Sequence, residues 1–314
     1  KNGTILEAGA AALHSSNKYL GSFLKDSNFA KIPVNPTFGL FDGARMLWDK
    51  KIGSRSFFIN LLVRYRGPYL RLRREVYKVL KKMESIYDQQ EGQEQAAYEV
   101  PGTLWQAVGL EHLATKNFED YLMNSLDLNS STAGRRLVHE FVYGVSMLNY
   151  NQPPSGLNAL SGLIGLASVL TGSLYAIGGG NQRLPEILLN QSGISVARGN
   201  LLLSTRIGAV SSSHASSSNS QTLHTIRLVG MSNEDILQNK SFDALFVTSP
   251  LASSALRINP DFQSVATVPS TFQRTVVTFV HGQFKPSIFP SKLPISSIPD
   301  HIIFARNSVK TLED

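Results

Sequence analysis

The residue types that most often carry chemistry are scattered along this 314-residue chain instead of forming a recognised motif. Its seven histidines show no His-x-x-x-His spacing and no adjoining run of carboxylates, which argues against a metal site. The sequence contains no Gly-x-Ser-x-Gly elbow and no cysteine. These absences exclude a cysteine nucleophile, a zinc–thiolate site, an iron–sulfur cluster and a disulfide framework.

One glycine run stands out. Gly178-Gly179-Gly180 precedes a predicted helix over Arg183–Leu189, and the backbone amides of such a turn can face a phosphate. However, neither a Gly-x-Gly-x-x-Gly fingerprint nor a Gly-Lys-Ser/Thr sequence is present. A flexible turn is therefore the simpler interpretation.

Several patterns predict the elements that position these residues. Gly3–Ala10 predicts a short strand that runs into a turn of small residues, and a helix is expected over 17–25. Alternation around Asp42-Gly43 predicts a tight hairpin. Ser56–Tyr87 has helical periodicity that is interrupted at Gly67-Pro68.

The remaining pattern predicts a mixed fold. Leu157–Leu170 is the most apolar segment, but it is too short to span a membrane and predicts a buried helix. Strand-like segments follow, among them Gln273–Val280. Helices flanked by strands on both sides predict an α/β (α+β) fold, with a largely helical substrate domain inserted into a nucleotide-binding domain.

Three stretches, in this order along the chain, resemble the prenylcysteine oxidase (prenylcysteine lyase) family. Leu6–His14 is similar to that family's Glu-Ala-Gly-Gly turn, which small residues and a histidine follow. Leu148–Gln152 is similar to an Asn-Tyr-Gly-Gln motif, and Leu174–Asn181 follows it at a compatible interval. Phe242–Leu251 is similar to a strand that ends in Thr-Pro-Leu beside the cofactor.

The resemblance implies an amine-oxidase-like, two-domain fold that binds FAD between its domains. Residues 1–30 and 177–251 would form a partial FAD-binding domain, and residues 31–176 and 252–314 the substrate domain. Because the chain starts at Lys1 without a dinucleotide fingerprint, we expect a truncated sequence. The N-terminal dinucleotide-binding unit and the C-terminal segment that closes over the flavin would lie outside it.

The resemblance also assigns residues to the cofactor. The expected FAD contacts are Glu7, Ala8, Gly9, Ala10, Leu201, Thr248 and Pro250. His14 and Tyr150 are the catalytic candidates, as polar groups near the flavin, although a lone His or Tyr in a packed turn is more often structural. Ala10 and Asn151 each replace a family glycine, and Asn151 suits the left-handed region better.

The implied reaction is oxidation of a thioether. FAD takes a hydride from the prenyl carbon next to sulfur, water adds, and the adduct collapses to cysteine and a prenyl aldehyde, while molecular oxygen is reduced to hydrogen peroxide. The substrate would be farnesyl- or geranylgeranyl-cysteine. Two alternatives stay open: an FAD amine oxidase-like enzyme, and a non-catalytic lipid-binding relative that has lost its flavin site.

A prenyl tail needs an apolar tunnel, and Leu157–Leu170 with Phe38, Phe41 and Trp48 are the candidates for its walls. The four Asn-x-Ser/Thr sequons permit an endomembrane location, in a lysosome or vacuole, or secretion.

The net charge of +7 is concentrated in one predicted helix. Its basic residues are Arg64, Arg66, Arg71, Arg73, Arg74, Lys78, Lys81 and Lys82. Two interpretations fit: a solvated helix face, or peripheral contact of residues 64–82 with an anionic membrane. Nucleic acid is not an expected partner, because no recognised binding module accompanies the charge.

Overall fold

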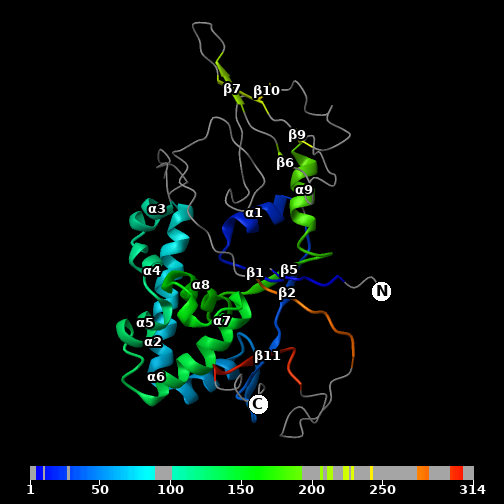
Figure 1. Cartoon of the computed structure of the whole chain (residues 1–314). Helices are drawn as coiled ribbons and strands as arrows, with labels where there is room; N and C mark the ends of the chain where they lie inside the picture. The colour runs from blue at the N-terminus through cyan, green and yellow to red at the C-terminus, as the bar shows by residue number, and fades with distance from the viewer. Residues whose placement is uncertain are drawn as a thin grey trace. The chain divides into compact units, whose positions relative to one another are not determined.

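The computed structural model describes residues 5–9, 11–26, 29–88, 101–192, 274–282 and 298–306, and five short strands between residues 206 and 242. The chain divides into two compact units, Lys1–Gln191 with Val277–Asp314, and Ser192–Val276. Helices and small sheets occur together, as the predicted α/β class requires (Figure 1).

The first unit contains the described helices. In chain order they are α1 (Lys18–Asp26), α2 (Arg55–Asp88), α3 (Pro101–Ala107), α4 (Glu111–Thr115), α5 (Phe118–Asp120), α6 (Thr132–Leu137), α7 (Tyr143–Tyr150), α8 (Ala159–Leu170) and α9 (Arg183–Gln191). Two π-helical turns, Tyr121–Ser125 and Val138–Val142, follow α5 and α6, and a 3₁₀ turn, Pro154–Gly156, precedes α8.

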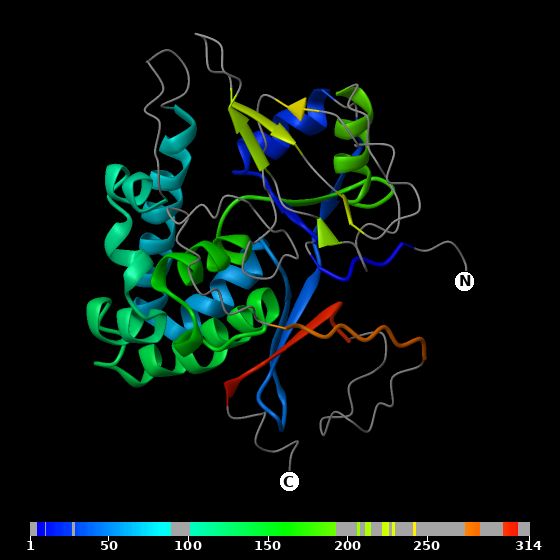
Figure 2. The ribbon, with the colours of Figure 1, turned by 45° about the horizontal axis from the view of Figure 1, so that its top comes forward.

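Two three-stranded sheets belong to the same unit. In one, β5 (Leu174–Ile177) lies between β1 (Leu13–His14) and β2 (Lys31–Val34), and both pairings are antiparallel. In the other, β3 (Thr37–Phe41) pairs antiparallel with β4 (Met46–Lys51) and parallel with β11 (His301–Phe304). Figure 2 shows β11 alongside the β3–β4 hairpin, whose turn at Asp42-Gly43 confirms the predicted hairpin.

The long helix α2 forms one wall of the core. Phe57, Leu61 and Tyr65 recur every four residues and are buried, and Leu72 and Val76 continue this face. The predicted break is confirmed just before Gly67-Pro68, because Arg66 has φ 54° and ψ −136°, which is not helical. Pro68 cannot donate a backbone hydrogen bond, so the helix changes direction at this point.

The apolar helix α8 packs in the centre, against α2, α4, α5 and α7. The Asn158 side chain caps it by accepting a hydrogen bond from the Ser161 amide. Gly162 and Gly165 allow close approach, because a Cβ at these positions would lie 2.2 Å from the Phe118 ring and 2.7 Å from the Tyr150 ring, respectively. The prediction of a buried helix is confirmed, and among the described residues no helix is long and apolar enough to cross a membrane.

The second unit contains the remaining described strands. These are β6 (Arg206–Ile207), β7 (Ser211–His214), β8 (Thr222–Thr225), β9 (Leu228–Val229) and β10 (Ser241–Phe242). The strand β8 pairs antiparallel with β7 and with β10, and β6 pairs antiparallel with β9.

Two strand predictions are wrong. Residues 5–9 form no strand and bend at residues 8–9, and the first strand among the described residues is Leu13–His14. Residues 274–280 also carry no strand, although their composition is strand-like. In both cases the residue types favour a strand, but no neighbouring strand pairs with the backbone groups of these residues. At Asn151 the left-handed conformation is observed, with φ 52°, at the end of α7.

The predicted division into an FAD-binding and a substrate domain stays a prediction. Its N-terminal part is joined to β5 through the β1–β5–β2 sheet. Most of its second part, residues 193–251, lies outside the described residues.

Packing at α8 generates a stability prediction. Gly162→Ala should destabilise the fold by about 1–3 kcal/mol, because its methyl group must displace the Phe118 ring in a packed core. As a matched control, Gly21→Ala adds the same methyl group to helix α1, where nothing lies within 4 Å. Gly21→Ala should instead stabilise by about 0.5–1 kcal/mol. Urea unfolding of both variants is the measurement, and equal shifts would contradict the packing argument.

Candidate functional site

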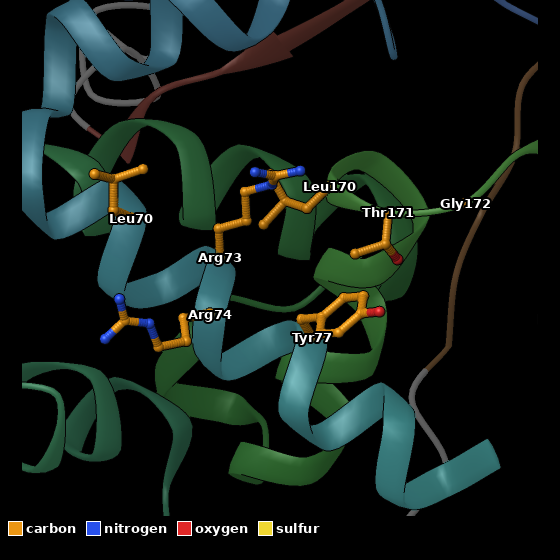
Figure 3. Close-up of a pocket in the computed structure, with 7 residues that line it drawn as sticks. All are labelled: Leu70, Arg73, Arg74, Tyr77, Leu170, Thr171 and Gly172. Atoms are coloured by element: carbon orange, nitrogen blue, oxygen red, sulfur yellow. The ribbon is translucent and has the colours of Figure 1, made fainter.

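A cavity of about 470 Å³ lies between one face of α2 and the C-terminal end of α8 (Figure 3). Helix α2 contributes Leu70, Arg73, Arg74 and Tyr77, and the chain leaving α8 contributes Leu170, Thr171 and Gly172. The α2 residues are spaced three or four apart and therefore share a helix face. Leu70 and Tyr77 are 48% and 63% exposed, so this face differs from the buried face of the same helix.

The cavity combines apolar walls with uncompensated positive charge. The Arg73 guanidinium lies 5.2 Å from the centre of the Phe58 ring, in cation–π geometry. Among the described residues, Arg73 and Arg74 form no ion pair, and no carboxylate lines the cavity. A pair of guanidiniums beside leucine side chains suits an amphiphile with an anionic group.

Other basic residues of α2 have polar partners within the chain. Arg71 lies 3.1 Å from Asp127, and Lys78 lies 3.5 Å from Glu75. Lys82 donates a hydrogen bond to the carbonyl oxygen of Gly109. The basic stretch predicted as a single charged face is therefore divided between paired and unpaired cations.

A second cavity, of about 520 Å³, shares walls with the first. Arg73 and the segment Leu170–Gly172 line both. Val34, Ile52 and Phe58 add further apolar surface. The three aromatic residues predicted as tunnel walls are not among the lining residues of these two cavities. Phe38 and Trp48 are buried in the main core cluster, and Phe41 is buried beside Phe304.

The candidate residue His14 lies behind the wall of the first cavity. Its Nδ1 accepts a hydrogen bond from the Ser16 amide, and its Nε2 lies 2.9 Å from the Thr171 carbonyl oxygen, to which it donates. Gly172 has φ 64°, and a Cβ there would lie 2.6 Å from the His14 ring. The observed role of His14 is to hold the turn that lines the cavity.

The other catalytic candidate, Tyr150, is the last residue of α7 and packs against α8. Its hydroxyl donates to the carbonyl oxygen of Ser161, its ring covers Gly165, and burial raises its pKa. Ser161 and Thr171 are ten residues apart, which corresponds to about 15 Å along a helix axis. The structure thus does not bring Tyr150 and His14 together.

The predicted cofactor turn is partly described. Glu7 Oε1 accepts a hydrogen bond of 2.7 Å from the Asn181 amide, so a side chain of the chain itself takes this donor of the glycine turn. Ala8 and Gly9 are exposed, and a Cβ at Gly9 would meet nothing within 4 Å. The other predicted contacts, Ala10, Leu201, Thr248 and Pro250, lie outside the described residues.

Sequence reasoning missed the cavity itself. A signal was available, because Leu70, Arg73 and Tyr77 recur at helical spacing on a face separate from the core face. The second wall, at Thr171-Gly172, depends on where α8 ends relative to α2. Residue spacing within one helix does not reveal the position of that helix relative to another. Among the described residues, no group of three or more His, Asp or Glu side chains is placed to hold a metal ion.

Comparison with known proteins gives a consistent result. The sequence model of the prenylcysteine lyase family matches residues 54–312. Over 93% of its length the chain is 23% identical to a prenylcysteine oxidase 1-like protein of cattle (Bos taurus) and 25% identical to its human (Homo sapiens) counterpart. The chain spans 57% of the length of each of these relatives.

The contact between His14 and Gly172 can be tested by a double-mutant cycle. Gly172→Ala should cost about 1–3 kcal/mol more than Gly53→Ala, because both glycines have positive φ but only the Gly172 site has a ring in the way. In a His14→Ala background this excess should shrink to the part caused by the Ser15 hydroxyl oxygen, which a Cβ at Gly172 would meet at 2.9 Å. Urea unfolding measures all variants, and an undiminished excess without the ring would contradict the role assigned to His14.

Proposed function

Since this chain belongs to the prenylcysteine lyase family, we propose that it takes part in FAD-dependent cleavage of the thioether in farnesyl- or geranylgeranyl-cysteine. The carbon next to sulfur is oxidised and molecular oxygen is reduced, so that thioether, water and oxygen give cysteine, a prenyl aldehyde and hydrogen peroxide. The family match over residues 54–312 is the observation that carries this proposal. The names of the two relatives point to the same class of oxidase.

FAD would supply the hydride acceptor, and the described residues fit it in one respect. The turn at Ala8-Gly9 is exposed and has open space beside Gly9, which permits a planar ring to approach the backbone. The glycine turn at 178–180 is a poor phosphate cradle, because Glu7 already accepts the Asn181 hydrogen bond and would repel an anion. The pyrophosphate therefore needs donors other than this turn.

The cavity between α2 and α8 is the proposed site for the substrate. Its volume lies within the range of about 300–1,000 Å³ that is typical of ligand pockets. Leu70 and Leu170 offer apolar contact to the prenyl chain, and Arg73 is placed to pair with the carboxylate of the cysteine. The residues of the chain would bind and orient the substrate, which leaves the oxidation to the cofactor.

The same cavity disfavours the amine oxidase alternative. Its charged lining groups are the two guanidiniums of Arg73 and Arg74, which repel a protonated amine. Prenylcysteine also carries an ammonium group, but its carboxylate gives the arginines an attractive partner. A non-catalytic lipid-binding protein would bind prenylcysteine in this cavity in the same way. The thioether oxidase and the lipid-binding protein are therefore distinguished by whether hydrogen peroxide is produced.

The proposal is tested with farnesylcysteine and its methyl ester, which lacks the carboxylate charge. With FAD supplied, farnesylcysteine should generate hydrogen peroxide, and Arg73→Gln should raise KM about tenfold for the acid, the loss expected for a charge-assisted hydrogen bond. The ester should show no change. Arg71→Gln is the matched control, since that guanidinium pairs with Asp127 outside the cavity.

Each other outcome of this experiment identifies an alternative. Binding of farnesylcysteine that depends on Arg73 but yields no peroxide would support the lipid-binding protein. Peroxide from a simple amine alone would establish the amine oxidase. Equal effects of Arg73→Gln on acid and ester would show that Arg73 does not bind the carboxylate.

We also propose that the unpaired cations of α2 contact anionic membranes. Arg74 and Lys81 lie two helical turns apart on the face of the exposed Tyr77, and neither pairs with a described residue. Joint replacement of Arg74 and Lys81 by Gln should reduce sedimentation with anionic vesicles, and salt should weaken the binding. Joint replacement of Arg71 and Lys78, whose charges are already paired, should change it less, and equal losses would refute the proposed face.

A further inference from the structure

We propose that a separate cavity, of about 480 Å³ between α2, α6 and β4, is a binding site for a phosphate group. Its polar walls are formed by Asn60, Arg64, Arg66, Thr132 and Arg136. It shares no lining residue with the two cavities beside α8. The proposal therefore stands independently of the thioether oxidase function.

The positive charge around this cavity is only partly compensated. Arg64 donates two hydrogen bonds to Glu140, of 2.6 and 2.8 Å, and this pairing raises the pKa of Arg64. The Tyr65 hydroxyl, whose pKa is raised by burial and then by Glu140, donates a further bond to the same carboxylate. Arg136 is only within 3.9 Å of Glu140. Glu140, already held by Arg64 and Tyr65, is thus the one described carboxylate near the three guanidiniums of the cavity, and Arg66 has no ion pair with it.

The backbone at Arg66, which lines the same cavity, is strained. Its φ of 54° with ψ of −136° is a conformation that glycine adopts readily and that other residues adopt at a cost in free energy. A glycine stands next to it at position 67, yet the arginine occupies the strained position. The Arg66 side chain has no hydrogen-bond or ion-pair partner among the described residues, so no polar side-chain contact compensates for the strain. A bound anion would supply that compensation.

Neutral donors complete the site. The Thr132 oxygen accepts a hydrogen bond from Arg135 and so keeps its own proton for another acceptor. The Asn60 amide also lines the cavity and adds neutral donors, whereas the Trp48 Nε1 is buried and interacts with the Tyr65 hydroxyl. Two guanidiniums with additional neutral donors suit the three terminal oxygens of a phosphate monoester better than the two oxygens of a carboxylate.

Phosphate of this kind occurs in lipid headgroups and in soluble phosphate esters. Val63, which also lines the cavity, is 71% exposed and could contact the apolar part of a lipid. A soluble phosphate ester would be bound by the polar wall residues alone. Both sources share the same recognition chemistry, so the experiment separates them.

The test uses calorimetric titration with inorganic phosphate and glycerol phosphate, and sedimentation with vesicles that contain phosphatidic acid or phosphatidylcholine alone. Arg66→Gly should weaken phosphate binding by about tenfold or more, while urea unfolding shows stability equal to or above that of the wild type, because the strain is relieved. Arg136→Gln should weaken binding to a similar extent. Arg71→Gln, which removes the same charge from the same helix, is the control and should leave binding unchanged.

Binding of both soluble phosphates that depends on Arg66 would confirm the site and assign it to soluble esters. Binding only to phosphatidic acid vesicles, lost in Arg66→Gly, would confirm it as a headgroup site. The proposal is overturned if neither form of phosphate binds, or if Arg66→Gly binds phosphate as tightly as the wild-type chain. Loss of binding in the Arg71→Gln control to the same degree would also overturn it, by showing a nonspecific charge effect.

Discussion

Close packing around helix α8 is the constraint on which the rest of the first unit depends. The helix is buried on several sides, and Gly162 and Gly165 let the Phe118 and Tyr150 rings reach its backbone. Because packed interiors deform little, the position of its C-terminal end is fixed with respect to α2. That end supplies Thr171 and Gly172 to two cavities, and His14 holds it from the other side. The candidate substrate site is thus a consequence of where one apolar helix stops.

Along helix α2, the positively charged side chains are divided among different surroundings. The break at Arg66 turns the helix before Pro68, and Arg64 and Arg66 line a different cavity from Arg73 and Arg74. Arg64 is held by Glu140, which lies in a π-helical turn, a local widening that often marks functional positions. Exposed pairs such as Arg71 with Asp127 contribute little stability, about 0–1 kcal/mol. These pairs do, however, leave the unpaired positive charge of α2 at the cavities and on one exposed face.

The sequence correctly predicted those elements that depend only on residues close together in the chain. Asp42-Gly43 predicted its hairpin, Gly67-Pro68 the break in α2, and the apolar run at 157–170 the buried helix, because each depends on neighbouring residues alone. Strand pairing at 5–9 and 274–280 was wrong, since a strand needs a partner that the sequence does not specify. The use of Glu7 as a hydrogen-bond acceptor for Asn181 joins residues 174 positions apart and has no local signal. The cavity walls were missed for the same reason.

The β1–β5–β2 sheet links the candidate cofactor turn to the candidate substrate cavity. Gly9 is five residues from His14, which limits their separation to about 18 Å even for an extended chain. His14 in turn binds Thr171, and β5 begins three residues later and pairs with the strand that contains His14. Hydride transfer requires reacting atoms within about 3–3.5 Å, and an error of about 1 Å is costly. A cofactor turn and a cavity wall that are anchored on one antiparallel sheet would move together, and this common anchoring can preserve such a distance more reliably than two independent loops.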